Sequence, residues 1–167
     1  MKKKVLVLGS GGREHALVWS FVNDENVSHV FCAPGNGGTA KIAENIPINL
    51  SNQQEIIRVV REKKIDLTVV GPENPLAEGI VDVFRSERLR IFGPDAYGAQ
   101  LESSKIFARD VMLEYKIPQP KYYSCSTINE AKVVKAKLGL PIVLKADGLA
   151  AGKGVIVCES EKDFSDA

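Results

Sequence analysis

Two glycine-rich segments of the sequence have the residue types and spacing of phosphate-binding loops. The first, Gly9-Ser10-Gly11-Gly12-Arg13, lies between an apolar run and a helical pattern. At that position its amides and the helix dipole could hold a phosphate, and the Arg13 guanidinium could pair with it. Residue 14 is glutamate where a dinucleotide-binding motif has its third glycine. We therefore expect phosphate binding without a nicotinamide cofactor, with a ligand-free tight turn as the alternative.

The second segment runs from Asp147 to Gly154 and is similar to a Walker A sequence, but it has one residue too few between Gly148 and Gly152. Gly154 also occupies the position of the Ser or Thr that would contact magnesium. Because strand-like residues flank the segment on both sides, it fits better a loop that joins two strands and folds over nucleotide phosphates. Lys145, just before it, could reach the same phosphates. A flexible hairpin turn is the alternative.

Short apolar runs alternate with helical patterns through the first hundred residues. The best strands are residues 5–8, 27–32, 67–70 and 90–92. Their unbroken apolar character suits a parallel sheet that is covered on both faces. The alternation predicts a doubly wound, Rossmann-like α/β fold.

The helices of this part are expected over residues 14–22 and 53–63, the second begun by a capping box of Ser51 and Gln54. Each predicted strand runs into a glycine-containing turn, at residues 9–12, 33–38, 71–73 and 93–95. In a parallel sheet these turns lie at the carboxyl edge, where open α/β folds bind ligands. Their coincidence predicts a site at that edge.

The pattern changes after Asp95. Ser103 or Ser104 can begin a helix with an apolar face that includes Tyr115, and the proline-rich segment 117–120 then favours a linker. The following elements are expected to be a strand over 122–125, a helix capped by Thr127, strands over 142–146 and 155–158, and a helix capped by Ser160. A final helix of about six residues is not stable alone, so we expect the chain to stop inside a second domain.

Composition excludes several classes of protein. The 22 basic and 21 acidic residues are interspersed, which argues against duplex nucleic acid as a partner. No apolar run approaches the roughly 20 residues that span a bilayer, and no signal peptide is recognisable. The three cysteines lack a C-x-x-C spacing, so we expect a reduced, cytoplasmic protein without structural zinc.

Five stretches together resemble the amino-terminal part of the glycinamide ribonucleotide synthetase (phosphoribosylamine–glycine ligase) family, within the ATP-grasp superfamily. They are VLVLGSGGREHA (5–16), APGNGGTA (33–40), VVGPENPL (69–76), FGPDAYGAQLESSK (92–105) and KADGLAAGKGV (145–155). They occur in the family's order and extend over essentially the whole chain. The main departure is length, since members of the family are much longer.

The resemblance implies an ATP-dependent ligase of de novo purine biosynthesis. ATP would phosphorylate the carboxylate of glycine, and the amine of 5-phosphoribosylamine would attack the glycyl phosphate to give glycinamide ribonucleotide. Cationic groups and Mg²⁺ would offset the charge on the transferred phosphoryl group. The metal ligands are expected beyond residue 167, so the chain alone is expected to be inactive.

The resemblance also implies roles for individual residues. Lys105 and Lys145 match the family's ATP-phosphate lysines, and Gly152, Lys153 and Gly154 match its phosphate-covering loop. The residues that would face phosphoribosylamine are Gly9, Ser10, Gly11, Gly12 and Arg13, at its phosphate, and Glu73. No catalytic residue and no metal ligand is assigned within the chain.

The implied domains are a Rossmann-like substrate domain over 1–102, a connecting helix and linker over 103–120, and the beginning of an ATP-grasp nucleotide-binding domain over 121–167. The implied partners are small-molecule substrates, with no nucleic acid and no membrane. Two alternatives stay open. One is a different ATP-grasp carboxylate–amine ligase, and the other is a non-catalytic module that binds a ribose phosphate.

Overall fold

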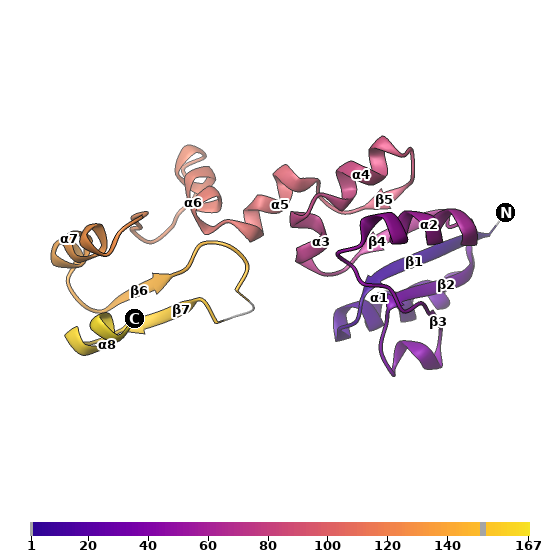
Figure 1. Cartoon of the computed structure of the whole chain (residues 1–167), viewed down its shortest axis with the longest axis horizontal. Coiled ribbons are helices and arrows are strands. Elements are labelled where there is room, and N and C mark those ends of the chain that lie inside the picture. Colours follow the sequence, from indigo (N-terminus) through magenta and orange to yellow (C-terminus); the bar gives the residue numbers. More distant parts are fainter. Residues whose placement is uncertain (1, 151–152) are drawn as a thin grey trace. The chain divides into compact units, whose positions relative to one another are not determined.

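The computed structural model describes residues 2–150 and 153–167, and the chain divides into two compact units between Ala99 and Gln100 (Figure 1). The first unit has a five-stranded sheet at its centre, with strand order β3-β2-β1-β4-β5. The strands are β1 (Lys3–Gly9), β2 (Val27–Pro34), β3 (Glu44–Asn45), β4 (Leu67–Val70) and β5 (Ile91–Phe92). Every neighbouring pair is parallel, which confirms the predicted sheet. Only the two-residue β3 was not predicted, because it is too short to have a period.

Helices cover both faces of this sheet, as a doubly wound fold requires (Figure 1). Helix α1 (Gly12–Val22) buries Val18 with the strand residues Val5, Val7 and Val69 on one face. On the other face, helices α2 (Gln53–Lys63) and α4 (Ile80–Ser86) pack Ile56 and Phe84 against Leu6 and Leu8. The fold class expected from the sequence is therefore confirmed.

Further short helices complete the first unit. They are the 3₁₀ turn η1 (Thr39–Lys41), α3 (Glu73–Ala77) and α5 (Ala96–Ser103), which continues past the boundary. The bounds predicted for α2 are confirmed, but the predicted capping box of Ser51 and Gln54 is wrong, since the Asn52 side chain accepts the Glu55 amide at 3.2 Å. Ser51 belongs instead to the preceding turn, where its amide donates to the Asn49 side chain.

The second unit contains α6 (Lys105–Glu114), α7 (Ile128–Leu138), α8 (Glu161–Asp166) and the antiparallel pair β6 (Ile142–Lys145) and β7 (Val155–Cys158). Thr127 and Ser160 cap α7 and α8 as predicted, and of the two candidates Ser103 and Ser104 it is Ser104 that caps α6. The strand predicted over 122–125 is wrong. That segment lies outside both sheets, and the Tyr122 hydroxyl instead donates to the Asp110 carboxylate of α6.

Tyr115 also departs from expectation. It was predicted on the apolar face of a helix, but it follows the last residue of α6 and is 70% exposed. All three cysteines are free thiols, with Cys32 and Cys158 buried and Cys125 exposed. In the part of the chain that the structure describes, no helix has the length and apolar character needed to cross a membrane.

Candidate functional site

The loop after β1 lies at the point where the strand order reverses. The chain passes from β1 to β2 on one side, whereas β4 pairs with β1 on the other. In open α/β sheets the crevice at this point is the usual ligand site. The Gly35 amide donates to the Gly9 carbonyl at 3.1 Å and the Gly71 amide to the Leu8 carbonyl at 3.0 Å, so turns from both sides meet the loop.

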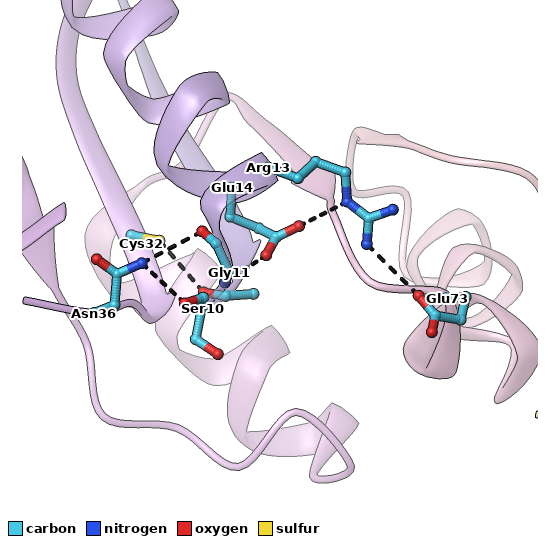
Figure 2. A network of polar contacts seen from close by, with 8 residues as sticks. Ser10, Gly11, Arg13, Glu14, Cys32, Asn36 and Glu73 are labelled. Carbon is cyan, nitrogen blue, oxygen red and sulfur yellow. Dashed lines mark hydrogen bonds and ion pairs between the residues drawn. The ribbon is translucent and has the colours of Figure 1, made fainter. Parts of the chain in front are cut away.

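Glu14, which the sequence reasoning noted only as a missing glycine, is the buried centre of this loop. It is 3% exposed, and its carboxylate accepts the Gly11 amide at 2.7 Å and the Arg13 Nε–H at 2.9 Å (Figure 2). The spacing from Gly11, the N-cap of α1, to Glu14 is that of a capping residue, and this signal could have revealed its role.

Glycines on two strand ends leave the space that Glu14 fills. A Cβ built on Gly9, Gly11 or Gly71 would lie within 3.0 Å of the Glu14 side chain, closer than real Cβ atoms pack. Gly9 also has φ +130°, a conformation that other residues rarely adopt. Gly9, Gly11 and Gly71 are therefore needed to admit the Glu14 carboxylate.

Arg13 links the loop to the element that follows β4. Its Nε is on Glu14, and its terminal NH2 lies 3.5 Å from a carboxylate oxygen of Glu73, the first residue of α3 (Figure 2). The hydrogen bond to Glu14 raises the pKa of the Arg13 guanidinium above its already high ordinary value, and Glu73 acts in the same direction. The structure thus brings together Arg13 and Glu73, two residues predicted to face one ligand.

Asn36 ties the turn after β2 to the same loop, a role that sequence reasoning missed. Its Nδ2 donates to the Ser10 carbonyl at 2.9 Å and the Gly11 carbonyl at 3.3 Å (Figure 2). Its Oδ1 accepts the amides of Gly38 and Thr39, at 2.7 and 3.0 Å. The Asn36 side chain therefore fixes the conformation of the turn after β2 and also holds that turn against the glycine loop.

Cys32 underlies the loop without belonging to its polar surface. Its thiol is 3.5 Å from the Gly9 carbonyl and fully buried. Burial raises the pKa of the Cys32 thiol, and the nearby Glu14 charge adds to this. A neutral thiol at this position packs as a small apolar group.

The second glycine loop, in the other unit, is held to the start of α6. The Asp147 carboxylate accepts the Lys105 amide at 2.6 Å and the Ile106 amide at 3.3 Å, and the Ser104 hydroxyl donates to it at 3.2 Å. Burial raises the pKa of Asp147, but these hydrogen bonds outweigh it and leave the pKa below its usual range. Asp147 is thus an anion bound at a helix N-terminus, where the dipole favours negative charge.

The predicted nucleotide-site residues have different surroundings. The Lys105 Nζ donates to the Gly148 carbonyl at 2.8 Å, so this lysine already contacts the loop. Lys145 ends β6 and Lys153 lies near the start of β7, both exposed. The Ala146 amide donates to the Gly154 carbonyl at 2.8 Å and closes the base of the hairpin. Gly152 lies outside the described residues.

No group of three or more His, Cys, Asp or Glu side chains within residues 2–150 and 153–167 is arranged to hold a metal ion.

The chain matches two domains of one known protein family. Residues 3–102 match the phosphoribosylglycinamide synthetase N domain, and residues 103–167 match the ATP-grasp (A) domain of the same synthetase. These matches extend over nearly the whole chain and confirm the resemblance. The chain belongs to the phosphoribosylglycinamide synthetase family.

Individual relatives carry the name phosphoribosylamine–glycine ligase. The protein from Clostridium acetobutylicum is 48% identical over 159 residues, which are 95% of this chain and 38% of the relative. That from Neisseria meningitidis serogroup B is 53% identical over 154 residues, which are 92% of this chain and 36% of the relative. The chain therefore spans less than two fifths of these relatives.

Solved structures also resemble this chain. The crystal structure of phosphoribosylamine–glycine ligase from Thermotoga maritima has a TM-score of 0.77 at 33% identity, over 97% of this chain and 38% of that one. An N5-carboxyaminoimidazole synthetase from Staphylococcus aureus, complexed with ADP, also has a TM-score of 0.77, over 99% of this chain and 44% of that one. At 18% identity the latter is evidence of a shared fold alone.

Proposed function

We propose that this chain is the amino-terminal portion of an ATP-dependent ligase that joins glycine to 5-phosphoribosylamine, giving glycinamide ribonucleotide through glycyl phosphate. The names of its relatives support this reaction. The observation that carries the proposal is the contact of Arg13 with Glu73 beside a glycine loop at the sheet's reversal point. A guanidinium suits a phosphate, and a carboxylate suits the amine and hydroxyls of an aminated ribose.

At the first site, the phosphate would be bound by the Gly9–Arg13 loop. Glu14 already occupies the Gly11 amide, so the contacts would come from the other amides of the loop and the start of α1. The first amides of a helix have no carbonyl partner within it. Arg13, whose side chain is 59% exposed, would add its charge from the solvent side. Glu73 would accept hydrogen bonds from the amine.

At the second site, Lys105, Lys145 and the loop residues Gly152, Lys153 and Gly154 would hold the phosphates of ATP. Lys105 fits this role because the Nζ contact described above is with a neutral carbonyl, which a phosphate can replace. ATP would supply the phosphoryl group that makes the glycine carboxylate an electrophile. We place the Mg²⁺ ligands in the part of the relatives that this chain does not span.

The domain division of 1–102, 103–120 and 121–167 belongs to the same proposal. So do a cytoplasmic location and the small-molecule partners glycine and 5-phosphoribosylamine, without nucleic acid or membrane. The interspersed charges and the absence of a membrane-spanning helix among the described residues support these assignments.

The test is ADP release by the full-length gene product. We expect release only when glycine and 5-phosphoribosylamine are both present, with glycinamide ribonucleotide as the product by mass. Stimulation by a different carboxylic acid would indicate another ATP-grasp ligase. Binding of a ribose phosphate with no ATP turnover would indicate a non-catalytic module. The 167-residue chain alone is expected to release no ADP.

A further inference from the structure

Glu14 carries a carboxylate into a buried position, which requires a structural explanation. Its side chain is 5% exposed beside an Arg13 side chain that is 59% exposed, so the anion is inside and the cation is at the surface. A buried carboxylate is unfavourable unless it is hydrogen-bonded. The Glu14 carboxylate accepts hydrogen bonds from two groups of the proposed phosphate site, the Gly11 amide and the Arg13 Nε.

We propose that Glu14 is a positioning residue for a phosphorylated ribose: it fixes the glycine loop and the Arg13 guanidinium before the ligand binds, without touching the ligand. This inference rests on the proposed function of the same site. Glu14 binds the inner Nε edge of the guanidinium, so the terminal nitrogens are left on the side of Glu73 (Figure 2). A long side chain held in this way loses less conformational entropy when it binds a ligand.

The charge arrangement agrees with an indirect role. Glu14 would repel a phosphate that came close to it, but the loop backbone and Arg13 lie around the carboxylate. Because its charge offsets part of that of Arg13, the gain from Glu14 is in geometry and not in net positive charge. Removing Glu14 should therefore weaken binding even though it removes a negative charge from the site. The direction of the change in affinity therefore distinguishes a positioning role from a simple electrostatic effect, which would strengthen phosphate binding when Glu14 is removed.

The experiment is calorimetric titration of the chain with ribose 5-phosphate. Glu14→Gln keeps the size of the side chain but puts an NH₂ group against one of two donors. We expect at least about a tenfold loss of affinity, the size of a charge-assisted hydrogen bond. Glu55→Gln is the matched control, because Glu55 has the same capping position in α2, away from the loop. It should leave affinity unchanged.

A double-mutant cycle with Arg13→Met separates positioning from a general loss of structure. If Glu14 acts through Arg13, Glu14→Gln should change affinity far less in the Arg13→Met background than in the native one. Equal effects in both backgrounds, or native-like binding by Glu14→Gln, would overturn the proposal. So would a native chain that does not bind ribose 5-phosphate.

Thermal melting by circular dichroism checks that each variant is folded. If Glu14→Gln does not fold, Glu14→Asp makes the same test, because the shorter side chain keeps the charge but cannot reach both donors. The outcome is separable from that of the proposed function. Suppose that the effects of Glu14→Gln and Arg13→Met on ribose 5-phosphate binding are coupled, but the full-length protein does not turn over ATP. The role of Glu14 would then be supported, and the ligase assignment would be wrong.

Discussion

Gly71 lies against the carboxylate of Glu14, so closely that a Cβ on Gly71 would be within 3.0 Å of Oε1. Gly71 lies in the turn after β4, whereas Glu14 lies in the first turn of helix α1, which follows β1. Their contact joins the two sides of the proposed substrate site through one buried side chain. Glu14 can also occupy this position only because Gly71 has no side chain.

Gly71→Ala should therefore displace Glu14. We expect a loss of about 1–3 kcal/mol in the free energy of unfolding, the range for an overpacked site. Chemical denaturation measures it. In a Glu14→Ala background the space is empty, and adding Gly71→Ala should then have little further effect. An equal loss in both backgrounds would show that the glycine is needed for another reason.

Thr68 offers a gain in stability. It is fully buried on β4 between Leu6 and Ile91, and its hydroxyl has no hydrogen-bond partner among the described residues. Thr68→Val removes the unsatisfied group at nearly constant shape, so we expect the free energy of unfolding to rise by about 1 kcal/mol. The matched control is Thr39→Val.

Thr39 is as buried as Thr68, but its hydroxyl accepts the Asn36 amide at 2.7 Å and lies 2.8 Å from the Asn45 Oδ1. The same substitution at Thr39 should destabilise the chain, because it leaves these partners without the hydroxyl. If Thr68→Val and Thr39→Val change the free energy of unfolding in the same direction, the hydrogen bonding of the two hydroxyls does not determine the effect of the substitution.

Asn36→Asp isolates the tie between the two turns. The new carboxylate can still accept the amides of Gly38 and Thr39, but it cannot donate to the carbonyls of Ser10 and Gly11. We expect a loss of about 1–2 kcal/mol in the free energy of unfolding and weaker binding of ribose 5-phosphate. Asn36→Ala, which also loses the acceptor, should be worse on both measurements. Full ribose 5-phosphate binding by Asn36→Asp would contradict a role for the tie.

Acid should release the second loop from α6. The pKa of Asp147 is below its ordinary value of 3.8 in the folded chain, so ionised Asp147 contributes stability above that value. The contribution is lost as the pH falls through the lower, folded pKa. We expect Asp147→Asn to be less stable at neutral pH and to lose less stability between about pH 5 and pH 2. Urea denaturation across this range measures it, and parallel curves would contradict the prediction.

The sequence predicted four of the five strands of the sheet because β1, β2, β4 and β5 each contain an apolar run that leads into a glycine-containing turn. It also predicted the caps at Ser104, Thr127 and Ser160, since these depend on neighbours three residues away. It missed Asn36, because the carbonyls that Asn36 binds lie in another turn and no local pattern shows them. It misjudged Glu14 although the spacing from Gly11 is local, because Glu14 was compared only with the third glycine of a dinucleotide-binding motif. The strand expected over 122–125 failed for a related reason, since strand character does not supply a neighbouring strand to pair with.

Because β1 pairs with both β2 and β4, the glycine loop after β1 cannot be completed during synthesis until β4 and the turn after it have been made. The loop residues 9–13 are made about sixty residues before β4 and Gly71. A nascent chain that ends before residue 71 has the motif without the turn that closes over Glu14. The glycine loop is therefore made well before it can reach its native structure.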